Sequence, residues 1–381
     1  MTLTERLLVF GDTRVPYRYG IDCTGPLTRT LTGHLADTDA VLVVVDEQVK
    51  DHAGALLPEL ARHVRVETLP LDATERHKTL QSVHAILEHA TQRRLTRRSA
   101  IIAMGGGTIG NIAGLAAALL YRGTRLIHLP TTPVAAFDAV VSIKQGVNLS
   151  AGKNLCGTYF APALIACDLR WLASVPRANL LTGLAEMAKN VLVAAPGQED
   201  RFAGAVGRLD RDLPAALHDL LTVGIDAKAP YLTGDPHERG PAIVFEYGHT
   251  AGHAIEFTSG GTVGHGEAVA WGMLVAAEVS RRRRGLDAAT VAAHRRLTAL
   301  LDLPDPRERF RHLDRAAVRA ALLADNKRGH GPCGPDEVLM VLLDGIGRPA
   351  VPDGRMPLVA VPVDVVMAAL DTALELEAVV R

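Results

Sequence analysis

The sequence has little lysine and no excess of charge of either sign. Its 381 residues include 41 Lys and Arg against 42 Asp and Glu, for a net charge of −1, and only seven of the 41 cations are Lys. The lack of a positive field argues against a nucleic-acid-binding surface. Since Arg supplies most generic positive charge, we expect the remaining lysines to mark positions that need a compact, titratable ammonium.

Cysteine and long apolar segments are also scarce. The four cysteines show no C-x-x-C spacing, which argues against a zinc knuckle or a redox pair, so we expect reduced structural thiols. No segment approaches the roughly 20 apolar residues that span a bilayer, and no charged leader precedes an apolar run. With 48% hydrophobic and 22% charged residues, the composition is typical of a globular protein with a large core. At about 150 residues per domain, we expect two domains in a cytoplasmic protein.

The N-terminal half predicts an open α/β sheet. Residues 40–45 (AVLVVV), 99–104 and 124–130 are short, apolar and unalternated, as in parallel strands that are covered on both faces. Helical segments at 72–93 and 111–121 separate them. Strands that alternate with helices are typical of a parallel sheet.

The C-terminal half predicts mostly helix. From about residue 168, long Ala- and Leu-rich segments show helical periodicity, and a weak β pair over 338–351 precedes a last helix over 363–380. The run of four arginines at 281–284 stands before a glycine, where cations suit the end of a helix, so we do not interpret it as a nucleic-acid patch. The expected helices are 178–195, 210–229, 247–257, 266–284, 287–301 and 314–324.

A glycine-rich turn at 104–111 (MGGGTIGN) follows one predicted strand. Gly105, Gly107 and Gly110 match G-x-G-x-x-G, in which bare amides at a helix start hold a pyrophosphate. The usual motif opens the first βαβ unit and has an acidic residue about 20 positions later, which is not the case here. The acid would have to come from an earlier strand end, where Asp46 stands. The alternative is a tight turn without a ligand.

The segment 130–154 combines many polar residues with small ones. It lies beyond a predicted strand end, where open α/β sheets bind ligands, and we expect it to be a loop. Lys144, Lys153, Asn148 and Asn154 would suit a phosphorylated, polyhydroxylated ligand. The alternative is an ordinary polar surface loop.

Three histidines lie within 17 residues. His249 and His253 are four apart and share one face of a predicted helix, and His265 follows in GHGE. Such a set, with a carboxylate from Glu186, could form a site of three ligands with one open position, as in catalytic zinc sites. Lys189 would stand close to the cation, which costs energy unless a bound anion offsets it. A lone H-x-x-x-H is usually coincidence or a core histidine.

Taken together, the motifs identify a family. GGGTIGN, YRG, PTT, GVN, GKN, GLAEMAKN, GHTAGHAIE, HGE and DNK occur in this order over about residues 40–330 and resemble the sugar phosphate cyclases, the superfamily of 3-dehydroquinate synthase. The resemblance implies a Rossmann-like NAD-binding α/β domain at 1–170 and a mostly helical, metal- and substrate-binding domain at 171–381. It also implies a divalent metal, zinc or cobalt, and a homodimer that binds no nucleic acid and no membrane.

The resemblance implies roles for individual residues as well. The metal ligands are Glu186, His249 and His265. The NAD-binding positions are Asp46, Glu75, Lys78, Gly106, Gly107, Thr108, Ile109, Gly110, Asn111, Thr131, Thr132 and Lys153. The substrate-binding positions are Arg122, which reaches across from a neighbouring subunit, Asp138, Lys144, Asn154, Lys189, Lys228 and Lys327. The catalytic side chains are Lys144, Glu246 and His253.

Departures from the family pattern indicate the substrate. Dehydroquinate synthases have an Arg seven residues before the first metal histidine, which grips a carboxylate, and an Asn three before it; here those positions are Ala242 and Glu246. Without that bidentate cation, a carboxylate substrate is disfavoured. The resemblance implies D-glucose 6-phosphate instead, converted to a carbocycle and phosphate by transient oxidation, elimination, reduction and an intramolecular aldol step. The alternatives are another cyclase such as dehydroquinate synthase, a metal-dependent polyol dehydrogenase, or a non-catalytic ligand-binding relative.

Overall fold

The computed structural model describes residues 3–150, 152–310 and 314–376. The chain forms two compact units, which we call the sheet unit and the helical unit. The sheet unit consists of Met1–Leu180, Arg211–Leu221 and Leu232–His237, and the helical unit of Leu181–Asp210, Thr222–Tyr231 and Glu238–Arg381. Among the described residues, no helix has both the length and the hydrophobicity to cross a membrane. The domain boundary at 170/171 stays a prediction.

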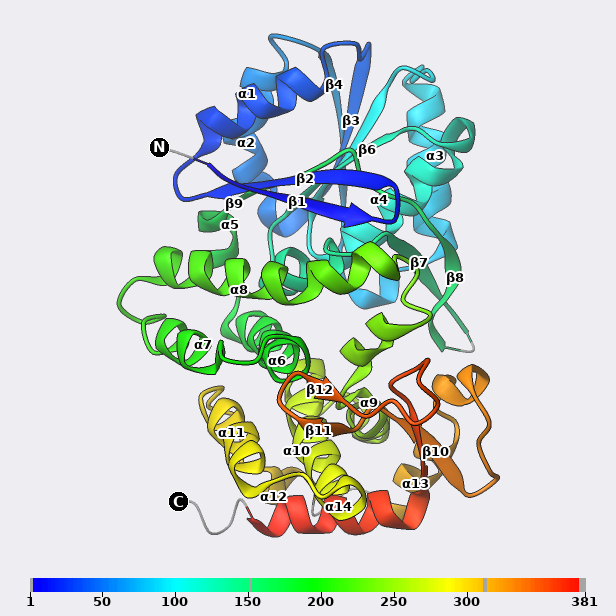
Figure 1. The fold of residues 1–381 in the computed structure, drawn as a ribbon. Coiled ribbons are helices and arrows are strands. Elements are labelled where there is room, and N and C mark those ends of the chain that lie inside the picture. The colour runs from blue at the N-terminus through cyan, green and yellow to red at the C-terminus, as the bar shows by residue number, and fades with distance from the viewer. Residues whose placement is uncertain (1–2, 151, 311–313, 377–381) are drawn as a thin grey trace. The chain divides into compact units, whose positions relative to one another are not determined.

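Seven strands form the central sheet of the sheet unit (Figure 1). Their order is β1 (Thr4–Phe10), β2 (Thr13–Gly20), β9 (Leu164–Asp168), β6 (Arg125–Pro130), β5 (Ala100–Gly105), β3 (Ala40–Asp46) and β4 (Arg65–Leu71). The edge strand β1 is antiparallel to β2, and every other neighbouring pair is parallel. The α/β sheet predicted from the sequence is confirmed.

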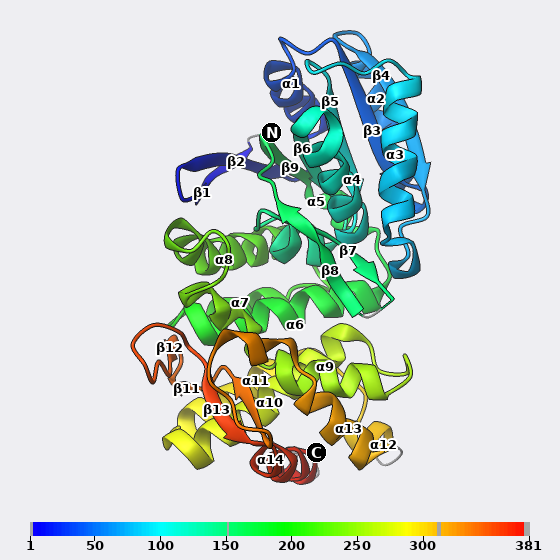
Figure 2. The same cartoon turned by 90° about the vertical axis from the view of Figure 1, so that its right-hand side faces the viewer.

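Helices cover both faces of this sheet (Figures 1 and 2). They are α1 (Thr24–His34), α2 (Lys50–Leu60), α3 (Leu80–Gln92) and α4 (Gly107–Leu119). Successive side chains of a strand point to opposite faces. Accordingly, Val43 of β3 packs in the core beneath α1 and α2, whereas Leu42 and Val44 pack in the core beneath α3 and α4. Burial on both faces explains the unbroken apolar run of β3.

The order of the strands reverses between β3 and β5. The chain leaves β3 for β4 on one side and returns to β5 on the other. In open α/β sheets, ligands bind at such a switch point, outside the carboxyl ends of the strands. Val45 is in register with Met104, so Asp46 and Gly105 end the two strands side by side. The structure thus brings the predicted acid to the glycine-rich turn.

The prediction of a loop over 130–154 is wrong. A π-helix, η4 (Ala135–Ala139), is followed by a hairpin of β7 (Lys144–Leu149) and β8 (Gly152–Tyr159). The hairpin packs on α4, where the side chain of Gln145 lies against Gly114 and the amide of Gly146 donates to Asn111 Oδ1 at 2.8 Å. These tertiary contacts give a polar segment a strand conformation that its own composition does not predict.

The helical unit is arranged around one long central helix, α10 (His265–Arg284), which packs against α9 (His249–Thr258), α11 (Ala288–Ala299) and α14 (Val363–Leu376). The helices predicted in this half are confirmed, with the largest difference at the one predicted over 210–229, which spans Leu213–Gly234. Residues 377–380 of the last predicted helix lie outside the described residues. The other α-helices among the described residues of this half are α5 (Leu169–Ala173), which belongs to the sheet unit, and α6 (Arg177–Ala194), α7 (Glu199–Val206), α8 (Leu213–Gly234), α12 (Pro306–Phe310) and α13 (Arg315–Leu323).

Two glycines of α10 allow its neighbours to approach closely. A Cβ atom at Gly272 would overlap the carbonyl oxygen of Gly248, immediately before α9. A Cβ atom at Gly266 would overlap the backbone of Thr182 in α6. Because these contacts leave no room for a side chain, α6, α9 and α10 come together near the start of α10, where the predicted metal ligands lie.

The predicted β pair over 338–351 is only partly right. β10 (Glu337–Met340) pairs with the distant β13 (Val359–Pro362), and only β11 (Leu343–Gly345) and β12 (Arg348–Pro349) form a local pair. The arginine run at 281–284 ends α10 as expected: Arg281 and Arg282 pair with Glu278, and Arg284 pairs with Asp344. Acidic partners within the same unit neutralise much of this cluster.

Candidate functional site

The glycine-rich turn presents bare backbone at the start of α4. Gly106 precedes the helix without a side-chain cap, so the first amides of α4 remain available to an anion. A Cβ atom at Gly107 would meet Ala139 Cβ at 3.6 Å, an ordinary contact. Packing within the protein therefore leaves room for a side chain at position 107. A ligand that approaches the backbone closely at this position would explain why the residue is glycine.

Two polar groups beside this turn fit a dinucleotide. Asp46 is 8% exposed, and burial raises the pKa of its carboxyl group. Thr131 is fully buried, and its Oγ1 has no hydrogen-bond partner among the described residues. Its amide donates to Gly105 O at 3.0 Å, which holds it at the strand edge. A ribose hydroxyl at Asp46 and a pyrophosphate at α4 are the groups such a site accepts.

The other predicted NAD-binding residues surround the same turn. Thr108 donates to Glu75 Oε2 at 3.4 Å, and Asn111 donates to Gly107 O at 2.9 Å. Gly110 and Ile109 form the first turns of α4, with Ile109 fully buried below Gly105. Thr132 Oγ1 accepts from the amide of Ala135 at 3.3 Å, and Lys78 and Lys153 lie at the hairpin described below. The structure thus gathers this set at one edge of the sheet.

The substrate-binding residues predicted in the sheet unit do not all lie at this edge. Asp138 is in η4 and Lys144 begins β7, where it is exposed. Arg122 lies in the short η3 (Leu120–Arg122) before the amino end of β6, whereas Thr131 follows its carboxyl end. At about 3.3 Å per residue, the length of β6 separates them by roughly 20 Å. Within one chain, Arg122 is therefore distant from the glycine-rich turn.

In the helical unit, three helices bring the predicted metal ligands together. Glu186 comes from α6, His249 from the start of α9 and His265 from the start of α10. Glu186 Oε1 lies 3.3 Å from His249 Nε2 and 3.2 Å from His265 Nε2, and the three ligand atoms all lie within 4.8 Å of one another. Ligands at about 2.0–2.1 Å from a tetrahedral ion are roughly 3.3 Å apart. The donor set and its spacing fit a divalent cation.

Outer-shell acceptors orient both imidazole rings. His249 Nδ1 lies 3.2 Å from the carbonyl oxygen of Tyr247, and His265 Nδ1 lies 2.8 Å from Glu256 Oε2. A carbonyl or carboxylate oxygen accepts, so each Nδ1 carries a hydrogen and each Nε2 faces Glu186, where it would be available to a bound metal ion. Glu256 has no role in the sequence prediction, although it stands seven residues after His249 on the same helical face.

Charges within this cluster favour a cation. Burial opposes protonation of His265, but its hydrogen bonds to Glu186 and Glu256 outweigh burial and raise its pKa to about 10. Burial alone would raise the pKa of Glu186, yet the ammonium of Lys189 and the two imidazoles hold it well below its usual value. The carboxylates that attract a proton to His265 would equally attract a metal ion. Zinc and cobalt both suit this donor set.

Four of the lysines are buried, which is unusual for this residue type. Lys is almost never buried unless it is paired. Yet Lys189 and Lys327 are each 2% exposed, Lys228 is 4% exposed and Lys78 is 7% exposed. Lys189 pairs with Glu186, and Lys228 lies 5.6 Å from the centre of the Phe245 ring.

The predicted catalytic side chains of the helical unit lie near these groups. Lys327 Nζ is 3.0 Å from Asp325 Oδ2 and 3.6 Å from Glu246 Oε2. The His253 ring centre lies 5.1 Å from that of His249 and 5.9 Å from that of His265. Asp325 was not predicted, although it is the first residue of the DNK motif. An ammonium, an imidazole and a carboxylate are thus gathered beside the metal cluster.

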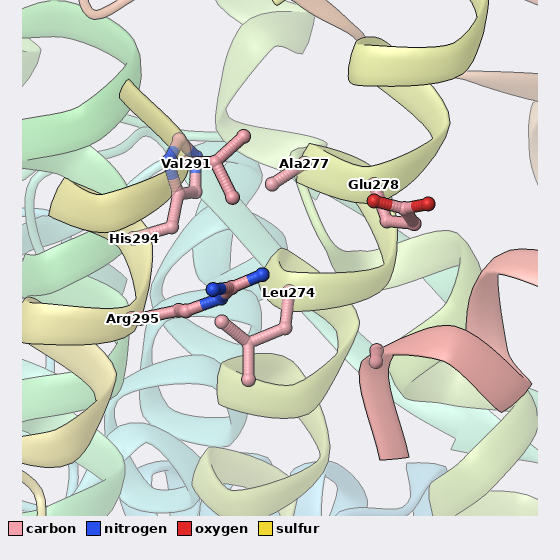
Figure 3. A pocket seen from close by; sticks show the side chains of 7 residues that line it. Leu274, Ala277, Glu278, Val291, His294 and Arg295 are labelled. Carbon is pink, nitrogen blue, oxygen red and sulfur yellow. The ribbon is translucent and has the colours of Figure 1, made fainter. Parts of the chain in front are cut away.

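Figure 3 shows a pocket elsewhere in the helical unit, between α10 and α11. Leu274, Ala277 and Val291 give it an apolar lining, beside the ring of His294. None of the residues predicted for the site is among the described residues that line it. His294 Nε2 lies 2.9 Å from the buried hydroxyl of Tyr247, so α11 helps to anchor the segment that leads to His249.

Two family models cover most of the chain. The model "3-dehydroquinate synthase N-terminal" matches residues 68–182, and "3-dehydroquinate synthase C-terminal" matches residues 183–328. The chain belongs to the 3-dehydroquinate synthase family. The family resemblance predicted from the motifs is thereby confirmed, and so is its fold of an α/β domain followed by a helical domain.

Several relatives that resemble this chain over nearly its full length share the same name. A 2-deoxy-scyllo-inosose synthase from Streptomyces fradiae is 42% identical over 94% of this chain and 83% of its own length. One from Streptomyces lividus is 42% identical over 94% of this chain and 93% of its own. A solved 2-deoxy-scyllo-inosose synthase, complexed with carbaglucose-6-phosphate, NAD+ and Co2+, is 31% identical with a TM-score of 0.86, covering 96% of this chain and 99% of that one.

Two further solved structures are less similar to this chain. The 2-epi-5-epi-valiolone synthase from Streptomyces hygroscopicus, with NAD+ and Zn2+ bound, is 26% identical with a TM-score of 0.80 and covers 97% of this chain and 99% of that one. A structure from Sinorhizobium meliloti described as a "probable glycerol dehydrogenase" shares the fold, at 15% identity and a TM-score of 0.65. The match covers 96% of this chain and 98% of that one.

Proposed function

We propose that this chain converts D-glucose 6-phosphate to 2-deoxy-scyllo-inosose and phosphate, using NAD and a divalent metal, zinc or cobalt. The observation that carries the proposal is its match, at a TM-score of 0.86, to a 2-deoxy-scyllo-inosose synthase that holds a glucose 6-phosphate analogue. Relatives of that name at 37–42% identity support it. The reaction would serve the biosynthesis of 2-deoxystreptamine aminoglycoside antibiotics.

The sheet unit would hold the dinucleotide. The amides at the start of α4 would donate to the pyrophosphate, and Asp46 would accept from a ribose hydroxyl. Thr131 and Thr132 at the end of β6 would close the other side of the turn. Bound NAD+ would supply a temporary hydride acceptor, so that no net oxidation occurs over the cycle.

Glu186, His249 and His265 would hold the metal, which as a Lewis acid makes a coordinated hydroxyl group more acidic. Glu246 would take part in proton transfer at carbon 5 of the sugar. Its side chain is 35% exposed, and its carboxylate lies 3.6 Å from the Lys327 ammonium. Lys144, Asn154, His253 and Lys327 would bind the phosphate and stabilise its charge as it leaves carbon 6. Asp138, Lys189 and Lys228 would bind the sugar.

The alanine at position 242 favours this reaction over that of dehydroquinate synthase. Ala242 is fully buried in η5 (Pro241–Glu246), where dehydroquinate synthases are expected to carry a carboxylate-binding arginine. An alanine offers no donor to a substrate carboxylate. Glucose 6-phosphate has no carboxylate, so the substitution leaves no charge unpaired.

Phosphate release tests the proposal directly. The purified protein, supplied with D-glucose 6-phosphate, NAD+ and Co2+ or Zn2+, should release phosphate and form the carbocycle without accumulating NADH. The Glu246→Gln variant should lose most of this activity with unchanged metal content. Turnover of the keto-acid phosphate of dehydroquinate synthase, with none of glucose 6-phosphate, would contradict the proposal. Stoichiometric NADH from a polyol would indicate a dehydrogenase.

We further propose a cytoplasmic homodimer in which Arg122 reaches the substrate site of the partner. The exposed position of Arg122, far from the glycine-rich turn of its own chain, supports a role in trans. Sedimentation should give twice the mass of 40.6 kDa. Mixing an Arg122→Ala protein with a Glu246→Gln protein should recover activity if each subunit completes the site of the other, and no recovery would contradict this arrangement.

A further inference from the structure

The hairpin of the sheet unit is interrupted by an irregularity at the position of its ligand-binding candidates. Val147 is paired with Cys156 and Leu149 with Gly152, so the single residue Asn148 faces three residues of β8. Two of those three are Lys153 and Asn154. Asn154 has a positive φ of 57°. Bulges of this kind redirect side chains, and they are common next to active sites.

Asn148 holds this bulge in place from the opposite strand. Its Oδ1 accepts from the amide of Asn154 at 2.9 Å. Its Nδ2 donates to Glu75 Oε1 at 2.8 Å, and its own amide donates to the carbonyl oxygen of Lys78 at 2.8 Å. One side chain thus joins β8 to the segment around η2 (Glu75–His77), which precedes α3.

The joined segment carries two of the predicted NAD-binding residues. Lys78 Nζ, on a side chain that is 7% exposed, donates to Asn154 Oδ1 at 2.5 Å. Glu75 accepts from Thr108 on the glycine-rich turn through its other oxygen. Asn148 and the hydrogen bond between Lys78 and Asn154 therefore both join the bulge to the segment that carries Glu75 and Lys78.

We infer that Asn148 is a positioning residue that couples dinucleotide binding, through Glu75 and Lys78, to the geometry of the bulge that presents Lys153 and Asn154. This inference rests on the proposed function, because it takes Glu75 and Lys78 as part of the NAD site. A ligand that orders these two residues also orders the hairpin, and by linkage an ordered hairpin strengthens ligand binding. Cofactor binding thus prepares Asn154, which the proposed function places at the substrate phosphate.

Two variants separate the two ends of the link. Asn148→Ala removes both side-chain bonds. Asn148→Asp keeps an acceptor for Asn154 but places a carboxylate against Glu75. Thr158→Ala, at an exposed position on the partner strand β8 of the same hairpin, is the matched control. The experiment measures the Kd for NAD+ by calorimetry and the amide exchange of β7 and β8 with and without NAD+.

In the wild-type protein, NAD+ should slow amide exchange throughout β7 and β8. Asn148→Ala should raise the Kd for NAD+ about tenfold, the loss expected for a hydrogen bond to a charged group, and should abolish the NAD+-dependent slowing. Asn148→Asp should do the same and, because its carboxylate repels Glu75, should also lower the protection of β7 and β8 without NAD+. Adding Glu75→Gln, which places a donor opposite the new carboxylate, should recover that protection. The Thr158→Ala control should match the wild type.

The outcomes distinguish the inference from the proposed function. An equal loss of protection with and without NAD+, at unchanged Kd, would show a merely structural role and overturn the inference. Wild-type Kd and protection in Asn148→Ala would overturn it while leaving the proposed function intact. If the wild-type protein neither binds NAD+ nor releases phosphate from glucose 6-phosphate, the proposed function fails and the coupling fails with it.

Discussion

The glycine-rich turn of the sheet unit and the metal cluster of the helical unit are built in opposite ways. At the turn, the groups available to a ligand are mostly backbone amides, made accessible by the absence of a side chain at Gly107. In the cluster, they are side-chain atoms of Glu186, His249 and His265, and glycines serve instead to bring helices together. A backbone site tolerates side-chain changes that keep its surface open. A side-chain site depends on every helix that carries a ligand.

The largest effect should come from breaking the cluster at Glu186. Glu186→Ala leaves the Lys189 ammonium buried without its carboxylate partner, and removing one member of a buried ion pair costs about 3–5 kcal/mol. We expect the variant to lose its metal and its phosphate release. Its free energy of unfolding, measured by urea denaturation, should fall by the same amount, about 3–5 kcal/mol. The paired variant Glu186→Gln with Lys189→Met should regain most of the stability and still bind no metal. Metal retained at wild-type affinity in Glu186→Ala would contradict the assignment.

Gly272→Ala should disturb the cluster without touching a ligand. The added methyl group would overlap the Gly248 carbonyl and press α9 away from α10, at a cost of about 1–3 kcal/mol for overpacking. Because His249 begins α9, metal affinity should fall as well. Gly204→Ala in α7, where nothing lies within 4 Å of the new atom, should instead be neutral or stabilising by up to about 1 kcal/mol. Equal metal affinity in both proteins would refute the role of the close approach.

Glu256 tests whether the outer shell contributes to metal binding. Replacing outer-shell partners typically costs 10- to 100-fold in metal affinity. Glu256→Gln keeps an acceptor for His265 Nδ1 but loses the charge, so we expect about a tenfold weaker affinity for Zn2+ by competition with a chelator. Glu256→Ala loses both and should approach 100-fold. If the two variants bind zinc as tightly as the wild type, the hydrogen bond at 2.8 Å has no part in holding the ion.

Gly107→Ala is the corresponding test of the backbone site. The new methyl group meets only Ala139 at 3.6 Å, so the melting temperature should barely change. It would, however, stand where a pyrophosphate approaches, and breaking one or two hydrogen bonds of about 1 kcal/mol each should weaken NAD+ binding by about tenfold. Gly33→Ala in α1, with open space around it, should leave the NAD+ affinity unchanged. Unchanged affinity in Gly107→Ala would place the dinucleotide elsewhere.

Much of the sheet was predictable because burial on both faces leaves a strong local signal. The run AVLVVV became β3 as expected, and the glycine-rich turn lies where the motif placed it. The start of α4 at Gly107, four residues earlier than expected, follows from Gly106, whose extended backbone lets the helix begin within the glycines themselves. The predicted end at Tyr121 is two residues late because Tyr121 has a positive φ of 54°.

The hairpin and the outer shell were not predictable from local patterns. β7 and β8 are half polar, and their pairing depends on contacts with α4 through Gln145 and Gly146. The pairing of β10 with β13 joins segments about 20 residues apart and likewise leaves no local trace. The spacing of the motifs was enough to predict His249 and His265 as ligands of one metal ion. Glu256 and Asn148 act through other residues, so the sequence marks them only by position.

The sheet unit is built from three separate segments of the chain, which limits where the protein can be cut into fragments. This unit includes residues 211–221 and 232–237, which the chain reaches only after it has entered the helical unit. From the first of these, His218 bonds to Thr4 at 2.8 Å and its ring packs 5.2 Å from that of the fully buried Tyr19. A fragment that ends at Leu180 would leave that face of the N-terminal hairpin uncovered and prone to aggregate. Expression of the two halves as separate polypeptides should therefore succeed only when both are present together.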